Sequence, residues 1–283
     1  MTNNTVIPIV SASDEKYAPY LGVMIQSLLN HLPDKYSVIF YIIDDYISEQ
    51  SKEHLNSLGQ IQYLSVNKAL YQNFLESDHI TQTAYYRISI PDLLVDLDYE
   101  KVLYLDADML ILDDISKLFQ TDLGDAIVGA VIDPGQAKAS ARLGITTNDY
   151  YFNSGTLLIQ LQQWRKNHIT KKTIDYLTNF PDKIIYHDQD ALNATLYENW
   201  FPLHPKWNMQ TSLIFRKHNA PDAHYAKTYE ESITLPSIIH FTGHDKPWNT
   251  LQGHPYTQAY LAQLQAGPFK KNMYQTKETE EIL

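Results

Sequence analysis

Two aspartates separated by a single residue follow a short apolar segment of this chain. The segment Val102–Leu105 leads directly into Asp106-Ala107-Asp108, and a second apolar run begins at Met109. In an open α/β sheet, ligands bind just beyond the carboxyl ends of the strands. Carboxylate oxygens are the ligands that hard divalent cations, and the phosphates they carry, prefer. The pattern predicts a metal–diphosphate site, although Asp-x-Asp also suits a turn in which aspartate binds backbone amides.

A histidine, a glycine and a lysine are grouped near the end of the chain. His240 interrupts the apolar segment Ile238–Phe241, and Gly243 and Lys246 follow shortly after it. Glycine lets the backbone approach a ligand closely, and lysine supplies a mobile charge for phosphate. The grouping favours a phosphate-binding loop, while a core histidine held only by hydrogen bonds is the alternative.

Polar residues also gather at four other predicted ends of strands and helices. These clusters are Ser11–Asp14, Thr83–Arg87, Tyr151–Gly155 and His187–Asp190. Ser13 or Asp14 could cap a helix, and Asp14 could instead accept hydrogen bonds from a base or ribose. Arg87 could bind a carboxylate or a phosphate through its planar fork, or form a surface ion pair. Asn153 could hold sugar hydroxyls or belong to a structural turn.

Composition narrows the class of protein. The chain has 283 residues, a formal net charge of −11 and no cysteine. The negative charge disfavours general nucleic-acid binding and broad attachment to anionic membranes. The absence of cysteine excludes disulfides and thiolate sites and fits a reducing compartment. The apolar run Val6–Val10 is too short for a signal peptide or a membrane span, so we expect a cytoplasmic protein.

Short apolar segments alternate with longer amphipathic stretches, which indicates an α/β fold with a mostly parallel central sheet flanked by helices. The expected strands are Val6–Val10, Ser37–Ile43, Ile61–Val66, Val102–Leu105, Ile127–Ile132, Thr156–Gln160 and Ile238–Phe241. Apolar residues recur at helical spacing in Tyr20–Leu28, Leu161–Asn179 and Asp188–Tyr197, and a helix is expected at Thr83–Arg87.

The second half of the chain is more irregular. Several prolines interrupt it, and we expect it to wrap around the sheet and build a substrate cleft. A catalytic domain is predicted over residues 1–262. Residues 263–283 are predicted to form a solvated C-terminal tail in which lysines and glutamates are mixed. A docking role for these lysines is the alternative.

The motifs, in this order, resemble the family 8 retaining glycosyltransferases, which include bacterial lipooligosaccharide α-galactosyltransferases and glycogenin. The similarity covers about residues 6–250. Asp106-Ala107-Asp108 matches the metal-binding triplet of that family, and His240 matches its third protein ligand within the pattern His-x-x-Gly-x-x-Lys-Pro-Trp. The resemblance implies a glycosyltransferase-A fold, Rossmann-like in its sheet, with Mn²⁺ bound by Asp106, Asp108 and His240. It also implies a UDP-sugar donor whose diphosphate the metal bridges.

The resemblance also implies where the donor binds. Gly243 and Lys246 are expected on the phosphates, Asp14 at the uridine and Arg87 at the sugar or its phosphate. The full set of expected donor-binding residues is Ser13, Asp14, Arg87, Asp106, Ala107, Asp133, Asn153, Gly243 and Lys246. One departure is visible, because Lys16 stands where the best-known bacterial member has an asparagine near the base.

Three residues at the start of one predicted helix are the expected catalytic residues: Asp188, Gln189 and Asp190. Gln189 matches the family residue that lies beneath the anomeric carbon, and Asp188 matches a position of the sugar pocket. Because an amide is a poor nucleophile, we expect front-face attack by the acceptor through an oxocarbenium-like state. A departing phosphate oxygen would take the proton of the acceptor. Attack by Asp190 is the alternative.

Two other classes of protein fit part of the pattern. A nucleotide-sugar or glycan-binding protein could keep the fold without turnover. Phosphatases of the haloacid-dehalogenase type also place Asp-x-Asp at a strand end, but their motif lies near the N-terminus and continues with Thr or Val, whereas Met109 follows here. The choice between a galactose and a glucose donor stays open, as do the carbohydrate or glycoconjugate acceptor and the oligomeric state.

Overall fold

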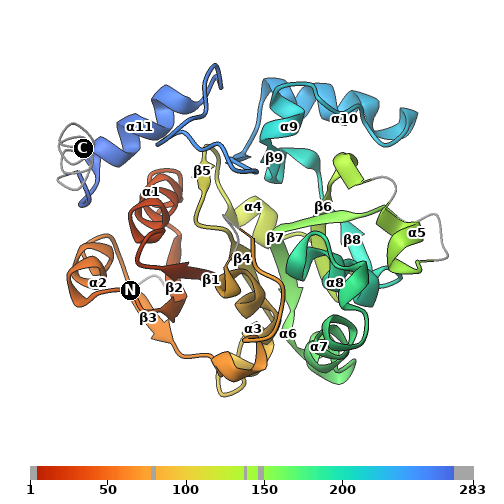
Figure 1. Ribbon diagram of the computed structural model, residues 1–283. Helices are drawn as coiled ribbons and strands as arrows, with labels where there is room; N and C mark the ends of the chain where they lie inside the picture. The colour runs from red at the N-terminus through yellow and green to blue at the C-terminus, as the bar shows by residue number, and fades with distance from the viewer. Residues whose placement is uncertain (1–4, 78–80, 137–138, 146–149, 271–283) are drawn as a thin grey trace, which may run out of the picture.

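The computed structural model describes residues 5–77, 81–136, 139–145 and 150–270 (Figure 1). Its centre is a seven-stranded sheet with strand order β3-β2-β1-β4-β7-β6-β8. These strands are β1 (Thr5–Asp14), β2 (Tyr36–Asp45), β3 (Ile61–Leu64), β4 (Lys101–Leu105), β6 (Val128–Ile132), β7 (Phe152–Gln160) and β8 (Trp200–Pro202).

The direction of the strands brings the predicted site residues to one edge of this sheet. Strands β3, β2, β1 and β4 are parallel, β7 is antiparallel to both of its neighbours, and β8 is parallel to β6. The start of β7 therefore lies at the same edge as the ends of β1, β4 and β6. Asp14, Asp106, Asp133 and Asn153 all stand at this edge, where ligands of such sheets bind.

A second, three-stranded sheet contains β5 (Met109–Ile111), β10 (Ile238–His240) and β9 (Met209–Gln210). Strand β10 is antiparallel to β5, with His240 opposite Met109, and it is parallel to β9. The segment 238–241 that the sequence pattern assigned to a strand therefore lies outside the central sheet. This pairing places His240 beside the residue that follows Asp108.

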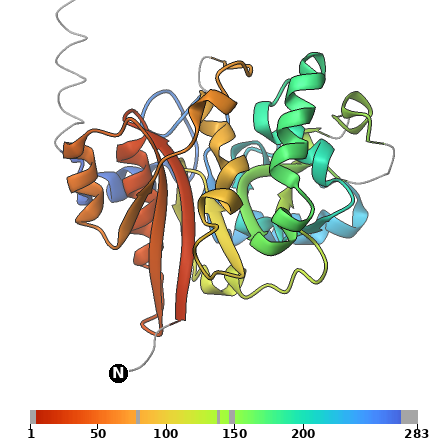
Figure 2. The same ribbon diagram turned by 90° about the horizontal axis from the view of Figure 1, so that it is seen from below.

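Helices cover both faces of the central sheet, and Figure 2 shows them on either side of the long strands β1 and β2. The α-helices are α1 (Ala18–Leu29), α2 (Glu49–Asn56), α3 (Ile90–Leu93), α4 (Ser116–Phe119), α5 (Ala139–Leu143), α6 (Leu161–Lys166), α7 (Ile169–Asn179), α8 (His187–Leu196), α9 (Thr211–Ile214), α10 (Ala223–Thr234) and α11 (Thr257–Ala266). Alternate residues of the strands enter two apolar clusters, one on each face; Val102 and Tyr104 belong to one cluster, and Leu103 and Leu105 to the other.

Two expected helices differ from the prediction. The single helix predicted over Leu161–Asn179 is divided into α6 and α7, because His168 adopts a left-handed backbone conformation with φ 54°. Such a residue ends one helix and lets another begin in a new direction. The helix predicted at Thr83–Arg87 is a 3₁₀ helix that spans Gln82–Ser89.

The last described segment packs on the first helix. Helix α11 continues past residue 262, where the catalytic domain was expected to end, and contacts α1. Phe269 is buried, and its ring occupies the space left by the missing side chain of Gly22. Most of the predicted tail, residues 271–283, lies outside the described residues. Within the described part of the chain, none of the helices has the length and apolar character needed to cross a membrane.

Candidate functional site

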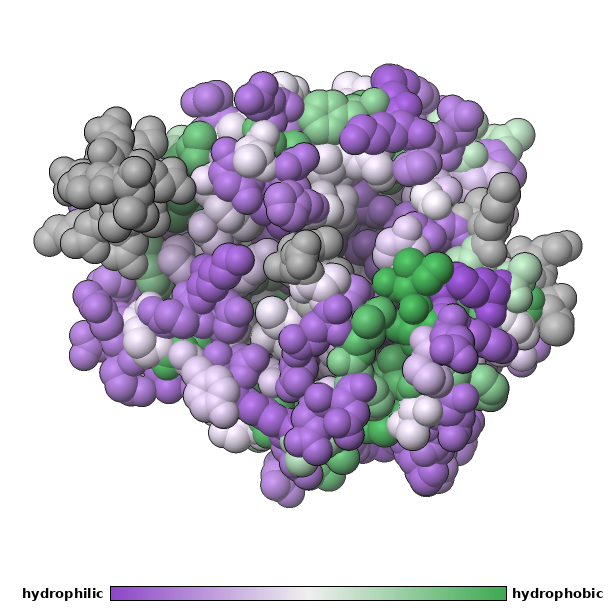
Figure 3. All heavy atoms as spheres, in the orientation of Figure 1, coloured by the Kyte–Doolittle hydropathy of each residue, from purple (hydrophilic) through white to green (hydrophobic). Residues whose placement is uncertain are grey.

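A cavity of about 310 Å³ opens at the carboxyl edge of the central sheet. Figure 3 shows that the face seen in Figure 1 is hollowed near its centre, with mostly hydrophilic residues on one side and an apolar patch near α8 on the other. The cavity brings together nearly all of the residues singled out from the sequence: Ser13, Asp14, Arg87, Asp106, Ala107, Asp108, Asp133, Asn153, Asp188, Gln189, His240, Gly243 and Lys246.

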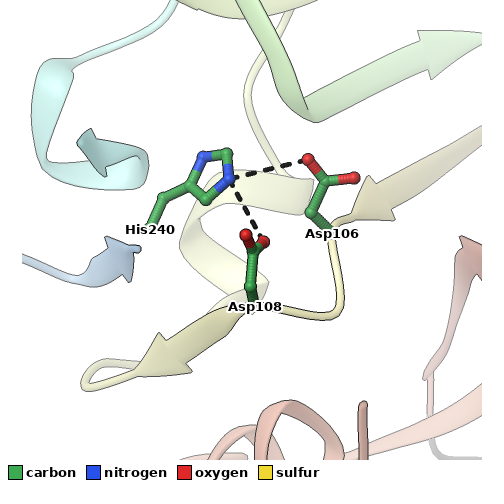
Figure 4. Close-up of side chains that lie close together, drawn as sticks. All are labelled: Asp106, Asp108 and His240. Atoms are coloured by element: carbon green, nitrogen blue, oxygen red, sulfur yellow. Dashed lines mark ion pairs between the residues drawn. The ribbon is translucent and has the colours of Figure 1, made fainter. Parts of the chain in front are cut away.

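Three of these side chains could hold a metal ion. The carboxylates of Asp106 and Asp108 and the imidazole of His240 offer ligand atoms that lie within 4.8 Å of one another (Figure 4). His240 Nε2 is 3.6 Å from Asp106 Oδ2 and 3.2 Å from Asp108 Oδ1. Two carboxylates and one imidazole suit Mn²⁺ and other divalent ions that accept oxygen and nitrogen ligands.

Gly155 makes room for this triad. A Cβ atom at this position would lie 2.3 Å from His240 Cε1 and 2.7 Å from Asp106 Oδ2. Any larger residue would therefore displace two of the three side chains. The need for glycine here was not recognised from the sequence, although Gly155 ends the cluster that begins at Tyr151.

Lys246 provides a positive charge beside the triad. Its ammonium group donates a hydrogen bond of 2.6 Å to Asp108 Oδ2 and one of 2.5 Å to the carbonyl oxygen of Phe241. Burial opposes ionisation of Asp108, but Lys246 and His240 outweigh it and hold the pKa of this carboxyl well below its usual range. Asp108 is thus ready to bind a cation without first losing a proton.

Arg87 joins the triad to the opposite wall of the cavity. Its guanidinium lies 3.0 Å from Asp106 Oδ1 and 3.1 Å from Asp188 Oδ2, and it donates a 2.6 Å hydrogen bond to the carbonyl oxygen of Ser154. Tyr104 donates a further hydrogen bond, 2.7 Å long, to Asp106. Arg87 is 5% exposed, so the sequence alternative of a surface ion pair is not what the structure shows. The buried guanidinium instead fixes two carboxylates in place.

Three cavity carboxylates, those of Asp14, Asp133 and Asp188, have pKa values that are raised by burial. Burial raises the pKa of Asp188 to about 6, although Arg87 and a hydrogen bond from Ser154 favour its ionised form. Burial also raises the pKa of Asp14, whose carboxylate accepts a hydrogen bond from the backbone of Tyr17 at the start of α1. Raised carboxyl pKa values in a cleft are typical of functional sites.

Gln189 is held in one orientation. Its side-chain oxygen accepts hydrogen bonds of 3.0 Å from Asn153 Nδ2 and from the backbone N–H of Ser154. Its amide nitrogen donates to Asp133 Oδ2 over 3.2 Å. A side chain held at both ends presents a fixed polar surface to the cavity.

Asp190 stands apart from the other predicted residues. It is fully buried and does not line the cavity. Its carboxylate accepts hydrogen bonds of 2.7 and 2.9 Å from Arg142, 2.8 Å from the hydroxyl of Tyr151, and 2.7 Å from the backbone of both Ile185 and Tyr186. These bonds use the acceptor capacity of both oxygens, so the geometry gives Asp190 a role in holding the loop before α8.

Sequence reasoning missed four side chains that hold the predicted ones. They are Tyr104, Asn208 and Arg142, which belong to no motif singled out as a site, and Ser154, to which no role was given within the cluster Tyr151–Gly155. Asn208 is fully buried and accepts a hydrogen bond from His240 Nδ1 over 2.9 Å. The only sequence signal for Tyr104 and Ser154 is their position next to a strand end that already carried a predicted site residue.

Comparison with known proteins places this geometry in a family. The model of the family described as glycosyl transferase family 8 matches residues 8–252. General stress protein A of Bacillus subtilis is 40% identical over 268 residues, which cover 92% of this chain and 94% of that protein. Lipopolysaccharide glucosyltransferase WaaO of Escherichia coli is 28% identical over 95% of this chain and 80% of its own length.

Solved structures agree with these matches. The crystal structure of galactosyltransferase LgtC in complex with donor and acceptor sugar analogs superimposes with a TM-score of 0.83 and 28% identity, covering 92% of this chain and 96% of that one. The glycosyltransferase GlyE of Streptococcus pneumoniae superimposes with a TM-score of 0.67 at 22% identity, a likeness of fold alone. The expected glycosyltransferase-A fold is thereby confirmed.

Proposed function

The chain belongs to glycosyl transferase family 8, and we propose that it transfers galactose or glucose from a UDP-sugar to a hydroxyl of a carbohydrate or glycoconjugate acceptor. The anomeric configuration of the sugar is retained, and Mn²⁺ is the metal. The observation that carries the proposal is the triad of Asp106, Asp108 and His240 in the wall of a cavity that also contains Lys246. Relatives named as glucosyltransferase and galactosyltransferase support a hexose donor and leave its identity between these two.

The ligand atoms suit the proposed metal. They are two carboxylate oxygens and one imidazole nitrogen, and Gly155 leaves the space that they need. When bound, Mn²⁺ would act as a Lewis acid on the diphosphate of the donor and stabilise the negative charge that develops there. Lys246 would add a fixed positive charge on the same side. Both groups favour departure of UDP.

The opposite wall of the cavity suits the sugar. Asp188, Gln189 and Asn153 offer acceptors and donors to sugar hydroxyls, and Arg87 keeps Asp188 in place. The oxygen of Gln189 already accepts two hydrogen bonds, which makes it a still weaker nucleophile. Asp190 does not line the cavity, and both of its oxygens accept hydrogen bonds from other residues. These arrangements favour front-face attack by the acceptor hydroxyl, with no covalent intermediate on the protein.

The test is release of UDP from a panel of UDP-sugars, with and without Mn²⁺, because slow hydrolysis of the donor needs no known acceptor. Wild type should release UDP from one hexose donor only when Mn²⁺ is present. Asp108→Asn should reduce the rate on the order of 10²- to 10³-fold, since it weakens the group that stabilises the developing charge. Asp113→Asn is the matched control, because Asp113 is a partly exposed aspartate paired with Lys117 and lies outside the cavity.

The outcomes separate the classes of protein. Binding of UDP and Mn²⁺ without release of UDP, even after addition of an acceptor library, would instead favour a nucleotide-sugar-binding protein. Release of phosphate from simple phosphomonoesters, with no action on UDP-sugars, would favour a phosphatase. Absence of any UDP binding would contradict the proposal.

A further inference from the structure

An unbroken chain of side-chain amides connects the proposed metal site to the sugar wall of the cavity. It begins at His240, whose Nδ1 lies 2.9 Å from Asn208 Oδ1. Asn208 Nδ2 donates to Asn153 Oδ1 over 2.8 Å, and Asn153 Nδ2 donates to Gln189 Oε1 over 3.0 Å. Gln189 Nε2 ends the chain on the carboxylate of Asp133.

Two backbone N–H groups fix the direction of every hydrogen bond in this chain. The N–H of Ser154 points at Gln189 Oε1 and that of Gly155 points at Asn153 Oδ1, each over 3.0 Å. A backbone N–H can only donate, so both side-chain atoms must be oxygens. Asn153 Oδ1 therefore needs a donor from Asn208, which turns the oxygen of Asn208 toward His240. The assignment of amide oxygen and nitrogen thus follows from the backbone of β7.

The same constraint decides which ring nitrogen of His240 carries the proton. Since Asn208 presents an oxygen, Nδ1 must donate a hydrogen bond to it, and in the neutral ring the lone pair is then on Nε2. Nε2 is the atom that faces Asp106 and Asp108, at 3.6 and 3.2 Å. The ring is thus orientated so that Nε2, and not Nδ1, is the nitrogen available to a metal ion.

We propose that Asn208 is a positioning residue for metal binding, because it accepts a hydrogen bond from His240 Nδ1 and so fixes the orientation of the ring. The backbone N–H groups of Ser154 and Gly155 in β7 in turn fix the orientation of the Asn208 amide. Asn208 is fully buried and does not line the cavity, so it acts through His240 and touches no ligand itself. Partners of this kind orient the first ligands of metal sites and raise their basicity. The inference rests on the proposed Mn²⁺ site.

Mn²⁺ titration in the presence of UDP, followed by the electron paramagnetic resonance signal of free Mn²⁺, tests the inference. Asn208→Leu keeps the approximate volume but cannot accept a hydrogen bond from His240, and it should weaken Mn²⁺ binding about 10- to 100-fold. Asn208→Asp keeps the acceptor for His240 Nδ1 but loses the donor to Asn153 Oδ1, so it should weaken Mn²⁺ binding clearly less than Asn208→Leu does.

The matched control is Asn193→Leu. Asn193 is another buried asparagine next to β7, and it exchanges hydrogen bonds with the backbone of Phe152. Its loss removes a buried amide without touching His240, so Mn²⁺ affinity should remain that of wild type. If Asn193→Leu binds Mn²⁺ as weakly as Asn208→Leu does, the inference is overturned, because both losses of affinity would then reflect general damage to packing.

Other outcomes have separate meanings. Equal weakening by Asn208→Leu and Asn208→Asp, or none by either, would overturn the inference while leaving the Mn²⁺ site intact. Failure of wild type to bind Mn²⁺ with UDP would overturn the proposed site itself, and the inference with it. Should Asn208→Leu not fold, ¹⁵N correlation spectra of the metal-free wild type decide: we expect a slowly exchanging proton on His240 Nδ1, and a proton on Nε2 alone would overturn the inference.

Discussion

Two sides of the first turn of α8 carry buried carboxylates with opposite surroundings. On the side away from the cavity, Asp190 accepts five hydrogen bonds, two of them from Arg142. On the cavity side, Asp188 shares the single guanidinium of Arg87 with Asp106. A saturated carboxylate has no acceptor capacity left for a ligand, whereas a carboxylate that shares its cation has. The number of partners therefore separates the aspartate that holds the fold from those that we propose bind a substrate or metal.

The largest effect on stability should come from removing the hydrogen bonds between Arg142 and Asp190. Arg142→Met removes the guanidinium from Asp190 and leaves the buried carboxylate with three neutral hydrogen-bond donors, which should cost about 3–5 kcal/mol of unfolding free energy. Release of UDP per folded molecule should be unchanged, because Asp190 does not line the cavity. Urea unfolding and the UDP-release assay measure the two quantities. A loss of turnover with unchanged stability would contradict the contrast between the two sides.

A smaller effect on the unfolding free energy is expected from Asp188 on the cavity side, and this effect depends on pH. Because burial raises the pKa of Asp188 to about 6, the folded protein holds a proton there that the unfolded chain has released between about pH 4 and 6. This group therefore adds stability below about pH 4 that is lost as the pH rises through 6. The change amounts to roughly 2–3 kcal/mol.

Asp188→Asn isolates this contribution. The difference in unfolding free energy between the metal-free wild type and the variant should change by that amount between pH 4 and 7, with wild type losing stability relative to the variant as the pH rises. Urea unfolding at several pH values measures it. If the unfolding free energies of wild type and variant change in parallel with pH, Asp188 has an ordinary pKa. Its electrostatic surroundings would then not distinguish it from Asp190.

The smallest effects should come from replacing a tyrosine by phenylalanine, once beside Asp190 and once beside the cavity carboxylate Asp106. Tyr151→Phe removes one of the five hydrogen bonds to Asp190, and Tyr104→Phe removes the hydroxyl bond to Asp106. Each should cost about 1 kcal/mol of stability. Only Tyr104→Phe should also weaken Mn²⁺ binding, because Asp106 is a proposed ligand. Equal Mn²⁺ affinities in both variants would show that Asp106 and Asp190 do not differ in their effect on metal binding.

The same two aspartates show where prediction from sequence ended. Residues 188 and 190 are about 200° apart around a helix, so only one of them can face a given cavity. The pattern of residues did not say which, and both were expected to be catalytic. Asp106 and Asp108 were easier to predict, because a strand end already indicates the side on which a ligand binds.

Partners distant in the sequence were beyond prediction. Asn208 meets His240 only because β9 and β10 pair, and Arg142 meets Asp190 across the space between α5 and α8. No local periodicity records such contacts. The division of residues 161–179 into two helices was missed for a related reason, since a single left-handed residue, His168, leaves the apolar spacing of the segment almost unchanged.

The pairing of β5 with β10 has a consequence for how the protein is made. Lys246 and Asp108, which form an ion pair, are 138 positions apart, and His240 reaches the two aspartates through the same long-range contact. Closing a loop of this length is a slow step in folding. A nascent chain that has emerged only as far as β9 already contains both aspartates, yet it lacks the imidazole and the ammonium group. The complete triad therefore forms only after β10 has emerged and docked on β5.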